Sequence, residues 1–441
     1  MNDLLTELRE RSLLYQATDE DALRKHLVAG DRAAGGRRIY TGFDPTADSL
    51  TIGNLVPIML LRKMQQAGHT PFVLLGGATG LIGDPSGKES ERSLRTRDEV
   101  DFNVDAQRKI FERLLNFDAK SPNHARMVNN IDWFEKISFL DALRDIGKHF
   151  SVNEMTKRDS VRDRLEREQG ISYTEFSYML LQAYDFLHLF RAEGVTIQSA
   201  GADQWGNIVS GADLIRRCEH NDTGSSLSFG FTAPLLTKAD GGKFGKTESG
   251  AIWLSHKRPS GTPGTSPYAY YQFWLNTSDA DVRKYLCIFT DLSLAEINDL
   301  CAKHASEPHL REAQRTLAQH ATTLLHGGGA MRAAEDAAKA LFSGEVRALD
   351  ADTLDEVFAA VPSTTHDKAS LGGGVSLVDV LAATSLAKSK SEARKHLEAG
   401  AVSVNGDKAD ADRTLTPNDL LYGRVVLLRR GKKSWHVTRW A

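Results

Sequence analysis

The feature that most constrains the fold is the alternation of strand-like and helical segments in the first half of the chain. Arg38 to Phe43 has the pattern of a buried strand, a helix is predicted from about Asn54 to Gln66, and Thr70 to Leu75 is the next predicted strand. Strand–helix–strand units of this kind form parallel sheets that are covered by helices. We therefore predict an α/β fold with a parallel sheet.

Three loops are expected at the carboxyl ends of strands in this sheet. They are residues 44–53, 76–80 and 201–206. Backbone N–H groups and helix N-termini converge at that edge, which is where open α/β sheets bind ligands. The three loops are therefore expected to line one cleft.

The second half of the chain is predicted to form separate parts. Helical patterns cover Pro267 to Asn276, Asp279 to Phe289, Leu294 to His304 and Leu310 to Leu325. Residues 345–374 lose strong periodicity and end in three glycines, as many linkers do. The predicted organisation is a catalytic domain at 1–255, a helical domain at 256–344, a linker at 345–374 and a small α+β domain at 375–441.

The last of these domains is basic, and the rest of the chain is acidic. Residues 375–441 contain twelve basic and seven acidic side chains, a net charge of +5. The whole chain carries −3, so the remainder carries −8. A basic module on an acidic body is typical of a protein that binds a polyanion.

Other features exclude several classes of protein. No apolar run approaches the roughly 18 to 20 residues of a membrane span, and the mixed charges of the first residues match neither a signal peptide nor a transit peptide. We therefore expect a cytoplasmic protein with no membrane partner. The three cysteines, Cys218, Cys287 and Cys301, lack paired short spacings and predict neither disulfides nor a zinc site.

Two glycine-rich segments are candidate phosphate-binding loops. Gly76 to Lys88 fails the spacing of a Walker ATPase, because Ile82 stands at its leading glycine and Glu89 at its magnesium-binding Ser or Thr. Lys238 to Thr247 combines three lysines with glycines on one loop, which suits a triphosphate. Taken alone, the first segment is also consistent with an ordinary turn-rich loop and the second with a solvated hairpin.

Polar residues within or beside apolar runs form the remaining pattern. On a helix, Tyr178, Gln182 and Asp185 fall at positions i, i+4 and i+7 and so share one face. Tyr40 and Asp84 have similarly apolar surroundings in the sequence. Burying an unpaired carboxylate costs free energy, so a buried stripe of this kind needs partners. The stripe is therefore either the wall of a polar pocket or the exposed face of an amphipathic helix.

Together these segments resemble the bacterial tyrosyl-tRNA synthetases of class I over nearly the whole chain. The longest matching strings are Tyr40 to Leu50, Gly76 to Pro85, Thr174 to Tyr178, Asp203 to Asn207 and Lys243 to Thr247. The resemblance implies a Rossmann-like catalytic domain, a helical anticodon-side domain and an RNA-binding domain of the ribosomal-protein type. It also implies that ATP activates tyrosine to tyrosyl-adenylate with release of pyrophosphate. The tyrosyl group would then pass to the 3′-terminal adenosine of tRNA(Tyr).

The resemblance also assigns roles to residues. Tyrosine binding falls to Tyr40 and Asp185 at the phenolic hydroxyl, to Asp84, Tyr178 and Gln182 at the ammonium group, and to Gln198 and Gln204 elsewhere in the pocket. ATP binding falls to Thr41, Asp44, Gly53, Gly201, Asp203, Leu235, Leu236 and Lys246. The catalytic set is Thr51, Asn54, Lys88, Arg92, Lys243, Lys246 and Thr247. Magnesium would be held mainly by the phosphates and not by a protein metal site, and no general base is needed for a carboxylate that is already ionised.

Further partners follow from the same resemblance. tRNA binding is assigned to Arg158, Arg216 and Arg217 in the body and to Lys388, Lys390, Arg394 and Lys395 in the last domain. A basic helix followed by a turn and a strand suits folded RNA, although each body arginine alone is equally consistent with a solvated helix charge. The family implies a homodimer, and no DNA partner is expected.

The chain departs from this family at its first signature. Family members commonly have His-Ile-Gly-His where this chain has Thr51-Ile52-Gly53-Asn54, and many have cysteine where it has Thr41. Thr and Asn supply hydrogen-bond donors but not the charge of an imidazole. One alternative is therefore a catalytically weak RNA-binding paralogue. The other is a sister synthetase for tryptophan, against which Tyr40 and Asp185 argue, because an indole would leave their polar groups unpaired.

Overall fold

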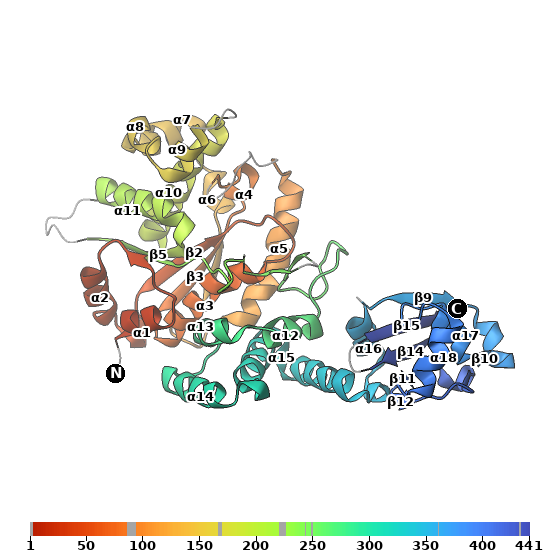
Figure 1. The fold of residues 1–441 in the computed structure, drawn as a ribbon. Helices are drawn as coiled ribbons and strands as arrows, with labels where there is room; N and C mark the ends of the chain where they lie inside the picture. The colour runs from red at the N-terminus through yellow and green to blue at the C-terminus, as the bar shows by residue number, and fades with distance from the viewer. Residues whose placement is uncertain are drawn as a thin grey trace. The chain divides into compact units, whose positions relative to one another are not determined.

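The computed structural model describes residues 3–85, 94–165, 170–219, 226–242, 244–247, 250–359, 361–431 and 434–441 (Figure 1). The chain divides into two compact units. Unit 1 consists of residues 1–265 and 277–320, and unit 2 of residues 266–276 and 321–441. In the described part of the chain, no helix combines the length and apolar character of a membrane span.

Unit 1 is built on a six-stranded sheet with the strand order β1-β6-β5-β2-β3-β4. Its strands are β1 (Gln16–Ala17), β2 (Arg38–Phe43), β3 (Thr70–Leu75), β4 (Arg126–Asn129), β5 (Val195–Gly201) and β6 (Phe229–Ala233). All neighbours from β6 to β4 are parallel, and only the short β1 pairs antiparallel with β6. The predicted parallel sheet is therefore confirmed, and β2 and β3 have the predicted bounds.

Helices cover both faces of this sheet. Because side chains alternate along a strand, Tyr40 and Phe43 of β2 face opposite sides. Tyr40 packs in one apolar cluster with Phe186 of α10, whereas the ring of Phe43 lies 4.8 Å from that of Phe111 in α5. The helices of unit 1 are α1 (Leu4–Glu10), α2 (Glu20–Val28), α3 (Ile52–Gln66), α4 (Thr79–Ile82), α5 (Arg97–Leu114), α6 (Ile131–Phe134), α7 (Phe139–Asp141), α8 (Val152–Met155), α9 (Asp159–Leu165), α10 (Tyr173–Glu193), α11 (Trp205–Cys218), α13 (Asp279–Phe289) and α14 (Leu294–Ser306). A two-stranded ribbon, β7 (Lys246–Thr247) with β8 (Gly250–Ala251), completes the unit.

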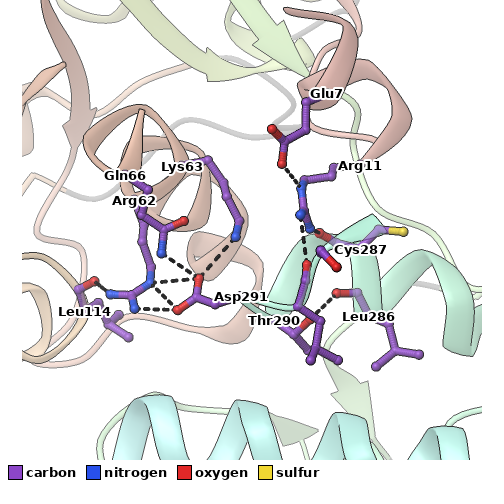
Figure 2. A network of polar contacts seen from close by, with 12 residues as sticks. Glu7, Arg11, Arg62, Lys63, Gln66, Leu114, Leu286, Cys287, Thr290 and Asp291 are labelled. Carbon is purple, nitrogen blue, oxygen red and sulfur yellow. Dashed lines mark hydrogen bonds and ion pairs between the residues drawn. The ribbon is translucent and has the colours of Figure 1, made fainter. Parts of the chain in front are cut away.

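The helices α13 and α14 belong to unit 1, which corrects the prediction of one separate helical domain at 256–344. Figure 2 shows the contacts responsible. The carboxylate of Asp291, between these two helices, accepts hydrogen bonds from three side chains of α3: Arg62 Nε at 3.1 Å, Lys63 Nζ at 3.1 Å and Gln66 Nε2 at 2.9 Å. Charge-assisted bonds between side chains more than 200 residues apart have no signature in the local sequence.

A second network in Figure 2 ties the N-terminal helix to the same region. Arg11 follows α1, is 3% exposed, and donates to the carbonyl oxygens of Cys287 at 3.1 Å and Leu292 at 2.8 Å. Its Nε also donates to Glu7 at 2.8 Å. The two networks fix α13 and the following loop to the helices beside the sheet.

Replacing Asp291 with asparagine is expected to lower the free energy of unfolding by about 1 to 2 kcal/mol, because the guanidinium of Arg62 and the ammonium of Lys63 lose their shared carboxylate. Burial alone would raise the pKa of Asp291, but hydrogen bonds from Arg62 and Gln66 and the charge of Lys63 outweigh burial and hold it well below its usual range. The stabilisation is therefore present above the ordinary carboxyl pKa of about 4 and is lost as the pH falls below it.

Urea unfolding of both proteins at pH 7 and at pH 3 would measure this effect. The difference in stability should be clear at pH 7 and should shrink at pH 3. Asp299→Asn is the matched control, because Asp299 is an exposed carboxylate on α14. Equal stability of Asp291→Asn and the unaltered protein at pH 7 would refute the role given to this network.

Unit 2 contains a five-stranded sheet with the order β12-β11-β14-β15-β9. Its strands are β9 (Ser363–His366), β11 (Val402–Val404), β12 (Asp407–Lys408), β14 (Val425–Arg430) and β15 (Ser434–Trp440), with a separate pair β10 (Val375–Ser376) and β13 (Thr414–Leu415). Its helices are α12 (Pro267–Leu275), α16 (Ala351–Phe358), α17 (Leu377–Ala382) and α18 (Lys390–Glu398). Residues 321–343 of α15 (Glu312–Ser343) also belong to the unit, and α15 has a non-helical residue at Gly327.

The structure differs from the prediction that residues 345–374 are a linker. β9 pairs in parallel with β15, and Leu354, Val357 and Phe358 of α16 are buried in an apolar cluster with residues of β14 and β15. The segment is ordered because it supplies one edge strand and one apolar helix face to the carboxyl-terminal fold. A four-residue strand and an eight-residue helix are too short to give a strong periodic signal.

Candidate active site

A cavity of about 710 Å³ opens at the carboxyl ends of the central parallel strands. Each of the three loops expected to form one cleft contributes to its wall, through Asp44, Gly76 and Gly201 among others. That prediction is confirmed. The volume lies within the range of small-molecule sites in proteins, about 300 to 1,000 Å³.

Most of the predicted site residues line this one cavity. The tyrosine-binding set is present in full: Tyr40, Asp84, Tyr178, Gln182, Asp185, Gln198 and Gln204. The ATP-binding residues on it are Thr41, Asp44, Gly53, Gly201, Asp203, Leu235 and Leu236, and the first signature contributes Thr51 and Asn54. Lys88, Arg92 and Lys243 lie outside the described residues, and only the backbone of Lys246 and Thr247 is described.

One end of the cavity is formed by Tyr40 and Asp185, both 1% exposed. Asp185 accepts hydrogen bonds from Trp133 Nε1 at 2.9 Å and from Asn130 Nδ2 at 3.1 Å. Burial raises its pKa to about 8, against the lowering effect of these two donors. Burial, together with the charge of Asp185, also raises the pKa of Tyr40, so the Tyr40 phenol stays protonated at neutral pH.

The polar stripe predicted on one helix is a wall of this pocket. Tyr178, Gln182 and Asp185 all lie on α10 and line the cavity, which excludes the alternative of an exposed polar face. Ser172 caps the start of α10 by accepting from the N–H of Glu175, and Gly194 ends it with a φ of 60° in the left-handed region. The helix therefore has well-defined ends on both sides of its functional face.

Carboxylates surround the middle of the cavity. The Tyr178 hydroxyl donates to Asp44 at 2.8 Å, and Gln204 Nε2 donates to Asp84 at 2.7 Å. Asn207 in turn donates to Gln204 Oε1 at 2.9 Å, which orients the amide of Gln204. Among the described residues that line the cavity, none is lysine, arginine or histidine. The described wall therefore favours a cationic group here.

The first signature begins α3 and uses a local hydrogen-bond lock. Both the backbone N–H and the hydroxyl of Thr51 donate to Asn54 Oδ1, at 3.0 Å and 2.9 Å. A backbone N–H can only donate, so this atom must be the amide oxygen, and the Asn54 NH₂ group remains as its donor. The helix N-terminus with Gly53 adds backbone N–H groups of the kind that bind phosphate.

The glycines after β3 leave space for neighbouring side chains. A Cβ at Gly76 would lie 2.2 Å from Asp44 Oδ1, and one at Gly77 would lie 2.2 Å from Asn129 Oδ1. The Thr79 hydroxyl also donates to Asp44 at 2.7 Å. These glycines make room for the side chains that shape the cavity.

The lysine-rich loop is tied to the first signature through its backbone. The N–H of Ile252 donates to Gly245 O at 3.1 Å, and the N–H of Ile52 donates to Ile252 O at 2.9 Å. Gly245 has a φ of 76°, and a Cβ there would lie 2.4 Å from Ile52 Cγ2. Phe244, which lines the cavity, stacks on Phe289 with ring centroids 5.6 Å apart.

Thr41 also lines the cavity, and its hydroxyl is 2.7 Å from that of Ser199. Leu235 is 62% exposed and lines the cavity with Leu236, so the two side chains offer an apolar surface there. A Cβ at Gly201 would lie 2.6 Å from Asp203 Oδ1, so glycine is needed for the position of that carboxylate.

The residues predicted to bind tRNA fall into two groups. Arg158 and Arg217 line a second hollow of about 80 Å³ in unit 1, where Arg217 donates to His149 O at 2.6 Å. Arg216 is exposed and pairs with Asp213. The four predicted residues of unit 2 are all exposed: Lys388 lies before α18, and Lys390, Arg394 and Lys395 lie on it.

Sequence reasoning missed Asn130 and Trp133, which hold Asp185. Asn130 directly follows β4, and its Oδ1 accepts from the N–H of Ala78 at 2.7 Å. The signal was available, because a polar pair at the end of a strand lies at the same ligand-binding edge as the other loops. The short strand β4 itself was not predicted, so this signal was not used.

Comparison with known proteins shows the family to which this chain belongs. Residues 34–343 match the family model of class I tRNA synthetases for tryptophan and tyrosine, and residues 353–438 match the C-terminal domain of tyrosine–tRNA ligases. The tyrosine–tRNA ligase of Roseiflexus castenholzii is 47% identical over 443 residues and covers 100% of both chains. That of Dechloromonas aromatica is 49% identical over 440 residues and covers 99% of both.

The chain belongs to the tyrosine–tRNA ligase family. A solved mitochondrial tyrosyl-tRNA synthetase from Aspergillus nidulans, truncated at its C-terminus, shares the fold, with a TM-score of 0.67 and 30% identity over 78% of this chain and 95% of that chain. As a class I ligase of this family, the enzyme uses tyrosine, ATP and tRNA. Full-length identity to tyrosine–tRNA ligases excludes the tryptophan alternative and supports an active ligase over a weak RNA-binding paralogue.

Proposed function

We propose that tyrosine binds in the cavity with its phenolic hydroxyl between Tyr40 and Asp185. The observation that carries this is a pair of buried polar atoms, the Tyr40 hydroxyl and Gln198 Oε1, which have no hydrogen-bond partner among the described residues. Tyr40 and Gln198 are directly paired across β2 and β5 and so face the same side of the sheet. An unpaired buried polar atom costs about 1 to 3 kcal/mol, and a bound phenol would satisfy the Tyr40 hydroxyl by accepting a hydrogen bond from it.

The ammonium group of tyrosine would lie among Asp84, Tyr178 and Gln182. The negative charge of this part of the wall favours a cation, and a like-charged phosphate would be repelled from it. In this proposal Gln204, whose amide accepts a hydrogen bond from Asn207, lies near the amino-acid carboxylate, which attacks the α-phosphate. Alignment and charge stabilisation, not a general base, are then the main requirements of the reaction.

ATP would occupy the rest of the cavity, with its ribose at Asp203, its adenine against Leu235 and Leu236, and its phosphates near Gly53 and Asn54. The described wall lacks a cation, so positive charge for the leaving pyrophosphate must come from other groups. We assign Lys88, Arg92, Lys243 and Lys246 to this role, and Thr247 to a neutral hydrogen bond with the phosphates. Magnesium would enter with ATP, because it is usually bound through substrate phosphates.

Tyrosine-dependent exchange of labelled pyrophosphate into ATP tests this assignment. We expect exchange with tyrosine and none with tryptophan. Absence of tyrosine-dependent exchange would reject adenylate formation in this cavity, whereas exchange with tryptophan would reject the proposed contacts of Tyr40 and Asp185.

For tRNA we propose two contact regions. The hollow with Arg158 and Arg217, together with Arg216, would meet the acceptor arm, and the basic surface of α18 would bind another part of the folded RNA through phosphates. We retain residues 1–255 as the catalytic part and 375–441 as the RNA-binding part. We also propose that the enzyme acts in the cytoplasm.

We further propose a homodimer that forms through exposed apolar residues of unit 1. They are Phe139 (67% exposed), Leu140 (75%), Leu143 (42%), Val152 (62%) and Tyr173 (63%), on or beside α7, α8 and the start of α10. Figure 1 shows α7, α8 and α9 together in one lobe of the unit. Exposed apolar patches of this kind usually mark protein interfaces.

Leu140→Asp is expected to convert a dimer into a monomer of 48.5 kDa at micromolar concentration, because a carboxylate would be buried without a partner in the interface. Sedimentation velocity measures the change. Phe102→Asp, at a residue of α5 that is 46% exposed, is the control and should leave the dimer intact. Unchanged sedimentation of Leu140→Asp would place any dimer interface elsewhere.

A further inference from the structure

A short segment of backbone, residues 250–254, joins the lysine-rich loop to the first signature. On one side, Lys246 pairs with Ala251 in the β7–β8 ribbon. On the other side, Trp253 forms a β-bridge with Thr51, and the N–H of Leu254 donates to Leu50 O at 2.8 Å. The position of this segment therefore sets the backbone position of Lys246 relative to Thr51.

The following residues, 255–265, form a loop that we call the clamp loop. Arg258 of this loop lies over the indole ring of Trp253, with Cζ 4.0 Å from the ring centroid. Its Nε donates to Asp48 Oδ1 at 2.8 Å, and its Nη2 contacts the same carboxylate. The N–H of Ser260 donates to the other oxygen of Asp48 at 2.9 Å. Asp48 lies three residues before Thr51. The clamp loop therefore contacts Trp253 directly and is bonded to the segment that leads into Thr51, its partner in the β-bridge.

The clamp loop is closed on itself by further contacts. Lys257 and Pro263 form a β-bridge, and the N–H of Thr265 donates to Ser255 O at 3.1 Å. The hydroxyl of Thr265 accepts from the N–H of Trp253 at 2.8 Å. A Cβ at Gly264 would lie 1.9 Å from Ser255 O, so only glycine fits this closure. The loop is thus a firm support for the guanidinium of Arg258.

Asp48 is ionised in this setting. It is 3% exposed, and burial would raise its pKa. The hydrogen bonds from Ser260 and Arg258 outweigh burial and lower the pKa below its usual range. A planar guanidinium can bind a carboxylate through its nitrogens and stack on an indole at the same time, which a lysine ammonium cannot do.

We infer that Arg258 is a positioning residue for adenylate formation, and that it acts through Trp253 and the 250–254 segment on Lys246. Arg258 is not among the residues that line the cavity, so its effect on the reaction must pass through other groups. The inference rests on the transition-state role proposed for Lys246. It adds that this role requires the junction of Asp48, Arg258 and Trp253.

The test is a double-mutant cycle on the full-length enzyme with tyrosine, ATP and labelled pyrophosphate. Arg258→Ala is expected to lower the maximal exchange rate by about tenfold to a hundredfold, the range for small misplacement of a catalytic group, with the Kd for tyrosine unchanged. In the Lys246→Ala background the same substitution should lower the rate by less than about twofold. Arg258→Lys should recover only a small part of the rate. Lys257→Ala removes an exposed charge from the same loop and should have no effect.

The inference would be overturned if Arg258→Ala lowered the exchange rate by the same factor with Lys246 present and with Lys246→Ala. Equal factors would mean that Arg258 acts independently of Lys246, as a general destabilisation of the enzyme would. A matching loss of tyrosine affinity would overturn it as well. If Lys246→Ala exchanges at the full rate, the proposed role of Lys246 fails, and the inference fails with it. Thermal unfolding shows whether each variant is folded at the assay temperature. Arg258→Lys replaces Arg258→Ala in the cycle if the latter is unfolded.

Discussion

Replacing Lys246 with alanine is expected to slow the formation of tyrosyl-adenylate by about 10² to 10³, the usual cost of removing one group that stabilises transition-state charge. Negative charge grows on the pyrophosphate as the α-phosphate is attacked, and the described wall of the cavity contains no cation to meet it. An ammonium group from the lysine-rich loop would supply that charge. In the proposed arrangement tyrosine binds at Tyr40 and Asp185 and not at the lysine-rich loop, so its Kd should change by less than about twofold.

Single-turnover kinetics of adenylate formation and equilibrium binding of tyrosine separate the two effects. Lys303→Ala is a suitable control, because Lys303 is an exposed lysine on α14. Comparable losses in rate and in tyrosine affinity would show that Lys246 contributes to ground-state binding and not to the transition state.

The second large effect is expected at Asp185. Asp185→Asn should lower kcat/KM for tyrosine by on the order of a hundredfold, since leaving a polar group without a partner in a buried site costs about 1 to 3 kcal/mol. The indole N–H of Trp133 would still donate to the remaining oxygen of the new amide. The NH₂ group of that amide would face the NH₂ group of Asn130, and two donors cannot pair. The substrate hydroxyl would therefore lose its acceptor. Activation of phenylalanine lacks this bond and should change little, so discrimination falls by the same factor.

Pyrophosphate exchange with each amino acid measures the loss of discrimination. Trp133→Phe tests the support of Asp185 separately, because it keeps an aromatic ring and removes the indole N–H that donates to Asp185. We expect a smaller loss, about tenfold, since the carboxylate stays in place with one donor fewer. Retention of full discrimination by Asp185→Asn would refute recognition of the phenol at this residue.

The sequence predicts the parts of this molecule that depend on short-range periodicity. The strands β2 and β3 have their predicted bounds, and the stripe of Tyr178, Gln182 and Asp185 was recognisable from helical spacing alone. The common cleft followed from a general property of parallel sheets, whose carboxyl ends meet at one edge. The roles of the residues in it came from family resemblance, which the spacing itself does not supply.

Contacts between distant side chains were beyond such reasoning. Asp48 and Arg258 are 210 residues apart, and Asp291 meets α3 across more than 220 residues. Neither pairing leaves a local pattern, because each depends on how separate elements pack. The same reason explains the misassigned linker, where β9 is a strand only because β15 lies beside it. Such pairing between distant residues or strands is determined by the whole fold and cannot be predicted from either segment alone.

The helix α10 has a consequence for the size of the amino acid that can be activated. Tyr178 and Asp185 are seven residues apart on one rigid helix, which corresponds to a rise of about 10 Å. The groups proposed for the ammonium and for the phenol thus stand at a fixed separation that packing against the sheet prevents from adjusting. An amino acid whose polar ends are closer together or farther apart would leave one end without a partner. Selection by length is therefore built into the same helix that supplies the selection by chemistry.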